Sequence, residues 1–262
     1  MNEDNIEIIP NEDEPNNLEN GFTINWLNLI IGAAICYFGL FDGWKLFIVL
    51  SLMVVVVIHE LGHIIIGKSF GCIIEEMQVF LLSFVSYKPK QIAGGSSWSN
   101  IKWSLGILPL GGFTVFKERP TDAVDDAEEY LPGEYTTFNS SYIDDKPAWQ
   151  RLLINAGGVL FNCATFLIVY PLLSYLPSSW YPSCATIALL SLIMFVINIL
   201  PIFPLDGGRI IFAFYEMITG IKPSPKFVNV CGVVGFIIII LFFWIFPGWT
   251  DVLINPLIEK LF

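Results

Sequence analysis

The chain has 262 residues, of which 55% are hydrophobic and only 14% are charged. Soluble proteins carry about 25% charged residues, so this composition and a mean hydropathy of +0.66 exclude an ordinary soluble domain and indicate a multi-pass protein in the lipid bilayer. The net charge of −11 and the lack of a basic cluster argue against nucleic acid as a partner.

Residues 1–20 form an acidic segment with seven Asp and Glu residues and no Lys or Arg. Such a segment buries too little apolar surface to fold, so we predict a disordered tail at 1–20 and a polytopic membrane domain at 21–262. The tail lacks the basic start of a cleavable signal peptide. A docking role for it is the less favoured alternative.

Apolar runs of about 20 residues are long enough to cross the hydrocarbon. They predict spans at about 23–41, 44–67, 151–176, 184–203 and 227–247. The shorter apolar stretch 208–220 is predicted to be a half-span or an interfacial helix. The expected fold class is an all-α multi-pass membrane protein with five or six transmembrane helices and a small membrane-associated β-hairpin region.

The second predicted span ends in His59-Glu60-Leu61-Gly62-His63, which contains both histidines of the chain. Residues four apart share one face of a helix, so both imidazoles can reach one metal ion. The glutamate between them is typical of zinc sites that hydrolyse peptide bonds. Because such side chains are costly in an apolar segment, they are functional candidates. The alternatives are a polar patch lining a water-filled cavity, or a chance match.

The longest hydrophilic region, 68–150, follows this span. Residues 74–118 alternate, carry β-branched and aromatic residues and are rich in glycine, which predicts strands and hairpins. Residues 119–147 are acidic, contain three prolines and are predicted to be an extended loop.

Most of the Lys and Arg residues lie in or next to 68–150, with three more after the fourth span. The excess of basic residues predicts that 68–150 is cytoplasmic and that the protein resides in the cell membrane. At 1.5 Å per residue, His59 then lies roughly 12 Å from a helix end at Gly67, which predicts an active site near the cytoplasmic side.

A catalytic zinc usually takes three protein ligands and leaves one position open. With both histidines used, the third ligand must be a carboxylate or a cysteine, and the five cysteines are scattered as small hydrophobic residues. Asp206 is the best candidate, because it ends an apolar span that Pro201 and Pro204 break. Glu75 and Glu76 are rivals, and Asp206 could instead cap the following helix.

Residues 44–220 resemble the site-2 protease family of intramembrane zinc metalloproteases. The resemblance is carried, in the order found in the family, by HELGH at 59–63, LPLGGF at 108–113, PAWQR at 147–151, GVLFN at 158–162 and NILPIFPLDGG at 198–208. Two departures stand out. Val159 replaces a usual proline, and about seven residues between the third and fourth spans leave no room there for the PDZ domain of many bacterial members, so we expect a compact member.

The resemblance implies one zinc ion per chain, bound by His59, His63 and Asp206, with Glu60 as the general base. It also implies four substrate-binding residues, namely Asn162, Asn198, Gly111 and Gly112. In the family the asparagines are thought to hold the substrate backbone, and the glycines belong to a hairpin whose edge can bind an unwound substrate. The alternatives are interhelical hydrogen bonds for the asparagines and a simple turn for the glycines.

The expected function is therefore intramembrane zinc proteolysis of single-span membrane protein substrates, as in regulated intramembrane proteolysis. The alternative is a non-catalytic zinc-binding membrane scaffold. Glu60 argues against it, because a structural zinc site is closed and needs no base. Two histidines are too few for a membrane di-iron hydroxylase. The sequence pattern predicts no particular oligomeric state.

Overall fold

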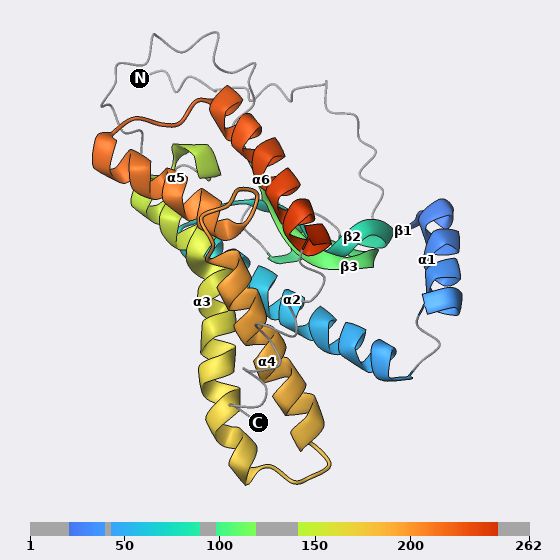
Figure 1. The fold of residues 1–262 in the computed structure, drawn as a ribbon. Helices are drawn as coiled ribbons and strands as arrows, with labels where there is room; N and C mark the ends of the chain where they lie inside the picture. The colour runs from blue at the N-terminus through green and yellow to red at the C-terminus, as the bar shows by residue number, and fades with distance from the viewer. Residues whose placement is uncertain (1–20, 40–42, 90–97, 119–140, 246–262) are drawn as a thin grey trace, which may run out of the picture.

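The computed structural model describes residues 21–39, 43–89, 98–118 and 141–245 (Figure 1). The predicted tail at 1–20 and residues 119–140 of the acidic loop lie outside this part of the chain. The helices and strands are, in order, β1 (Gly21–Ile24), α1 (Trp26–Gly39), α2 (Gly43–Ser69), β2 (Ile74–Lys88), β3 (Lys102–Phe116), α3 (Ala148–Leu172), α4 (Tyr181–Asn198), α5 (Asp206–Thr219) and α6 (Pro225–Ile245).

Within the described residues, four helices are long and apolar enough to cross a membrane, at Lys45–Ser69, Ala148–Tyr175, Tyr181–Asn198 and Pro225–Phe242. The predicted helical fold with a small sheet is confirmed, and four of the predicted spans are found as such helices among the described residues.

The apolar run 23–41 was predicted to be a membrane span, but in the structure it begins as a strand that is followed by a short helix. Its helix, α1, has 14 residues, or about 21 Å, against a hydrocarbon thickness of about 30 Å. The start of the run forms β1, which pairs with β2, and Phe22 packs on Tyr87 with ring centroids 4.8 Å apart. Counting apolar residues does not separate such a strand from a helix. The stretch 208–220 lies in α5, which also has only 14 residues.

The strands predicted within 74–118 are confirmed as β2 and β3, and both strands bend. Residues 76–79 pair on one side with 102–105 and on the other with 112–115, while 103–105 also pair with 85–87. The rows of the sheet therefore run 21–24, 85–88, 102–105, 76–79 and 112–115. The bend in β2 falls where Phe80 and Leu82 have positive φ, of 65° and 57°, which is uncommon for residues other than glycine.

The row 112–115 is an edge of the sheet within the described residues, and it runs along α2. A Cβ placed on Gly112 would lie 2.9 Å from Val56 and 3.1 Å from the Glu60 carboxylate. Further along, Gly67 leaves room for the ring of Phe116. Residues 119–147 were predicted to be an extended loop, but 143–145 form a short 3-10 turn.

The buried core lies between α2 and the sheet, and α3 packs on the other side of α2. The core is formed by Val56, Ile64, Ile74, Met77, Val79, Phe80 and Ile101. Helices α2 and α3 approach closely at Gly62 and Gly157, since a Cβ on Gly157 would lie 2.6 Å from the carbonyl oxygen of Gly62. Small residues allow this approach of two helix backbones. Figure 1 shows α3 and α4 side by side below this crossing.

Candidate active site

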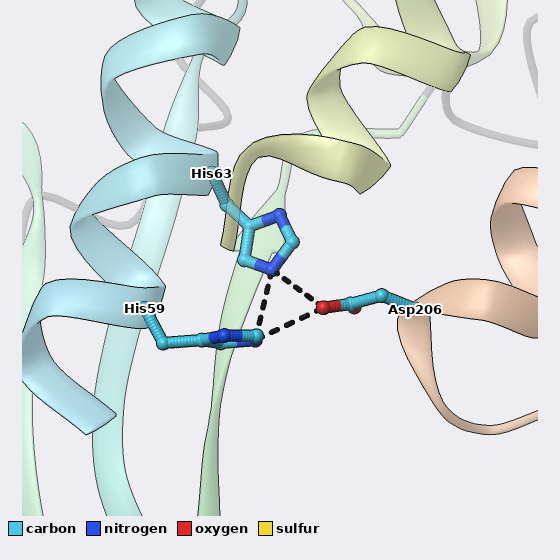
Figure 2. Close-up of side chains that lie close together, drawn as sticks. All are labelled: His59, His63 and Asp206. Atoms are coloured by element: carbon cyan, nitrogen blue, oxygen red, sulfur yellow. Dashed lines mark hydrogen bonds and ion pairs between the residues drawn. The ribbon is translucent and has the colours of Figure 1, made fainter. Parts of the chain in front are cut away.

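His59, His63 and Asp206 converge on one point between α2 and α5 (Figure 2). The two Nε2 atoms of the histidines lie 3.3 Å apart. Oδ2 of Asp206 lies 2.9 Å from Nε2 of His59 and 3.2 Å from Nε2 of His63. All three side chains are nearly buried, the most exposed being Asp206 at 12%. Residues 59 and 63 meet because they are one helical turn apart, as the sequence predicted.

The triangle of ligand atoms fits a zinc ion. Zinc bonds of about 2.0–2.1 Å in a tetrahedral site separate the ligand atoms by about 3.3 Å, and the observed sides are 2.9, 3.2 and 3.3 Å. Two imidazoles and one carboxylate are also a ligand set that zinc uses in catalytic sites. Among the residues that the structure describes, no other cluster of three or more His, Cys, Asp or Glu side chains is found.

The rival carboxylates are engaged elsewhere or lie outside the cluster. Glu76 is on the sheet, where Lys102 approaches its Oε1 to 3.1 Å and Ser104 donates a 2.5 Å hydrogen bond. Glu75 precedes it on β2 and is not part of the cluster. The residue at the N-cap of α5 is Leu205, and Asp206 is the first helical residue. Its carboxylate therefore faces the histidines instead of capping the helix.

Each histidine is held through its other ring nitrogen. Nδ1 of His63 lies 2.8 Å from the carbonyl oxygen of Ile154 on α3. That carbonyl can only accept, so Nδ1 carries the hydrogen and Nε2 offers its lone pair to the centre of the triangle. Such partners orient metal-binding imidazoles and select their tautomer.

Asn162 orients the imidazole of His59 in the same way, through Nδ1. The Asn162 amide nitrogen is 3.0 Å from Nδ1 of His59, while its oxygen is buried without a partner among the described residues. A half-turn of the amide brings that oxygen to Nδ1, where it accepts the hydrogen that a metal-binding imidazole carries there. The family resemblance implied a substrate-binding role for Asn162, and the structure places its side chain against His59.

The other predicted substrate-binding residues lie in two places. Asn198, at the end of α4, donates a 3.0 Å hydrogen bond to the carbonyl oxygen of Met194 in the same helix. Gly111 and Gly112 belong to β3 rather than to a turn between strands. Gly111 has a φ of 111°, which favours glycine, and Gly112 lies against Glu60.

Glu60 is 3% exposed and lies between α2 and the edge row of the sheet. The hydroxyl of Thr114 donates a 2.8 Å hydrogen bond to its Oε2. Sequence reasoning missed this partner. The available signal was the alternation of a strand, which places Thr114 on the same face as Gly112.

Gly158 on α3 closes the site from a third side. A Cβ at this position would lie 2.5 Å from Nε2 of both His59 and His63. Any larger residue would therefore push the imidazoles out of place. The sequence pointed to Gly158 only as part of a motif, and this steric role comes from the structure.

Comparison with known proteins places these residues in a family. The model of peptidase family M50 matches residues 47–181 and 176–242, which is most of the chain and includes all three members of the cluster. A relative from Rickettsia conorii is 48% identical over 122 residues, covering 47% of this chain and 30% of the relative. A zinc metalloprotease of Methanocaldococcus jannaschii is 26% identical over 203 residues, covering 78% of this chain and 43% of the relative.

A solved structure, a site-2 protease from Methanocaldococcus jannaschii, is 22% identical, with a TM-score of 0.47, and the match covers 85% of this chain and 78% of that one. The chain spans about a third of the length of the first curated relatives it matches, between 29% and 31%. The family model alone covers well over half of the chain. The resemblance seen in the sequence is thus confirmed, and the chain belongs to peptidase family M50.

Proposed function

We propose that this protein is a zinc metalloprotease that cleaves the transmembrane segments of single-span membrane proteins. The observation that carries the proposal is the triangle of His59, His63 and Asp206 with the Glu60 carboxylate on the same helix. In the ligand set, His59 and His63 supply Nε2 and Asp206 supplies Oδ2. Zinc in such a site polarises the scissile carbonyl and lowers the pKa of water.

Glu60 is the proposed general base. Its carboxylate accepts a proton from the attacking water and returns it to the amine that leaves. The hydrogen bond from Thr114 holds one carboxylate oxygen and so limits rotation of the group. Burial of Glu60 and both histidines keeps bulk water from competing with these contacts.

The edge row 112–115 is the proposed binding surface for the substrate. Its outer side has no strand partner in the described part of the chain, its inner side pairs with row 76–79, and one of its faces lies against Glu60. An extended peptide added to this edge would form main-chain hydrogen bonds. A transmembrane helix uses those same groups internally, so the substrate has to unwind locally before it can bind.

We further propose that the site lies within the membrane, near its cytoplasmic side. His59 is ten residues before the end of α2 at Ser69, or about 15 Å along the helix. The basic residues gather at this end of the chain's apolar helices, in and next to 68–150. Substrate cuts are therefore expected in the cytoplasmic half of a transmembrane segment.

The test compares the wild type with Glu60→Gln and Asp206→Asn in membranes that contain a single-span substrate. Gln is nearly isosteric with Glu, so Glu60→Gln should keep about one zinc per chain while losing all cleavage, because an amide cannot accept the proton. Asp206→Asn should lose much of its zinc. Metal analysis and mass spectrometry of substrate fragments provide both measurements.

Undiminished cleavage by Glu60→Gln, or cuts confined to soluble loops, would refute the proposal. A wild-type protein that binds one zinc ion per chain but cleaves no substrate would favour the alternative, a non-catalytic zinc-binding scaffold.

A further inference from the structure

A chain of buried polar contacts connects the two helices that carry the metal ligands. It begins at Phe70, directly after α2, whose carbonyl oxygen accepts a 2.5 Å hydrogen bond from Nζ of Lys146. The carbonyl oxygen of Lys146 in turn accepts a 3.1 Å hydrogen bond from Nε of Arg151. Arg151 then forms an ion pair with Glu216 on α5. The contacts therefore run from the end of α2 through the start of α3 to the end of α5.

These groups are unusually well buried for charged side chains. Lys146 is 3% exposed, and the side chains of Arg151 and Glu216 are 15% and 11% exposed. Charged side chains are rarely buried unless they are paired. Replacing a buried ion pair by apolar residues is often neutral, so such a pair is weak evidence for stability. Removing one partner alone leaves an uncompensated buried charge, which is costly.

The position of this ion pair explains why it would matter for the metal site. Helix α5 begins at Asp206, and Glu216 lies ten residues later, about 15 Å along the same helix. Arg151 lies three residues before Ile154, whose carbonyl oxygen holds His63. The first two turns of α3 therefore make two contacts: Ile154 holds His63 on α2, and Arg151 holds Glu216 near the end of α5.

We propose that Arg151 and Glu216 are positioning residues that hold α5 against α3 and thereby set the distance from Asp206 to the two histidines. The bonds between zinc and its ligands are expected within about 0.2 Å of their usual lengths. A small tilt of α5 would carry Oδ2 of Asp206 outside that range. This inference rests on the proposed zinc site and concerns what keeps its third ligand in place.

An exposed ion pair near the same end of α5 provides a matched control. Lys222, just after α5, lies 3.5 Å from Asp144, and these side chains are 53% and 39% exposed. Exposed ion pairs contribute little, because water screens them. Breaking this second pair changes the same kind of interaction without disturbing the buried connection between α2, α3 and α5.

The experiment uses the full chain in detergent, loaded with Zn²⁺ and dialysed against a series of chelator concentrations, with retained zinc measured by metal analysis. Arg151→Glu and Glu216→Arg should each weaken zinc binding by about tenfold, the lower end of the 10- to 100-fold loss that follows removal of a direct hydrogen-bond partner of a metal ligand. The double variant, in which the charges are exchanged, should recover most of the affinity. Lys222→Glu should match the wild type.

Two further measurements separate positioning from a general effect on folding. In the Co²⁺-loaded protein, the single variants should show weaker visible absorption bands at saturating Co²⁺, because the aspartate no longer completes the site. Glu216→Gln keeps the shape of the side chain but leaves the charge of Arg151 unpaired, so the metal-free protein should unfold at a lower temperature than the wild type. Its zinc binding, measured where circular dichroism shows that the variant is still folded, should be weaker than that of the wild type.

Wild-type zinc affinity in Glu216→Gln and in both folded single variants would overturn the positioning role and leave the proposed function intact. A wild type that binds no zinc would instead overturn the proposed function, and the inference that depends on it.

Discussion

The hydroxyl of Thr114 donates a 2.8 Å hydrogen bond to Oε2 of Glu60, so the edge row of the sheet and helix α2 are joined at the proposed general base. Gly112, two residues earlier, leaves room for the same carboxylate. The strand that is proposed to bind the substrate therefore also orients the group that is proposed to activate water. Binding and proton transfer would depend on one short segment of β3.

Thr114→Val should lower kcat, because valine keeps the size of the side chain but cannot donate to Glu60. A hydrogen bond to a charged group contributes about 1.5–3 kcal/mol, so the loss should be about tenfold or more. KM should change less, since the substrate's own contacts remain. Steady-state kinetics on a purified substrate measures both values. Thr114→Ser keeps the hydroxyl and should recover activity, and a serine variant as impaired as the valine variant would refute the role of the hydrogen bond.

Gly158→Ala should lose most of its zinc, because the new methyl group would lie 2.5 Å from Nε2 of both histidines. Alanine favours helix more than glycine does by about 1 kcal/mol, so α3 itself should remain folded. Metal analysis after purification, together with circular dichroism, provides the measurement. Gly43→Ala, at a helix position where a Cβ meets nothing within 4 Å, is the control and should keep its zinc. Equal zinc content in the two variants would contradict the steric role of Gly158.

Asn162→Ala should weaken zinc binding about 10- to 100-fold, because Nδ1 of His59 loses the group that orients it. Asn162→Asp still offers an oxygen to the Nδ1 hydrogen and should bind zinc more tightly than the alanine variant. Competition with a chelator gives the affinities. If both variants bound zinc as tightly as the wild type, Asn162 would not orient His59, and the substrate role implied by the family resemblance would be favoured.

The proposed topology predicts opposite sides of the membrane for Lys222→Cys and Ser179→Cys. The first follows α5 and the second lies in the short connection between α3 and α4. In intact cells, a membrane-impermeant maleimide should label position 179 and should reach position 222 only after the cells are opened. The unmodified chain gives the background from its own cysteines. Labelling of position 222 from outside would reverse the orientation predicted from the basic residues.

The sequence by itself determined the features that depend on near neighbours in the chain. His59 and His63 share a face because a helix repeats every 3.6 residues, and apolar length located the four long helices. Alternation and glycine located β2 and β3. Asp206 could be named because prolines and glycines interrupt an apolar run beside it, which marks a polar residue in an unusual place.

Only the tertiary structure decided the contacts between distant segments. Thr114 is 54 residues from Glu60, Arg151 is 65 residues from Glu216, and Asn162 is 103 residues from His59. No local period relates such positions, because their meeting depends on how whole helices and strands pack. The same reason explains β1: an apolar segment becomes a strand rather than the start of a span when β2 supplies an edge with which it can pair.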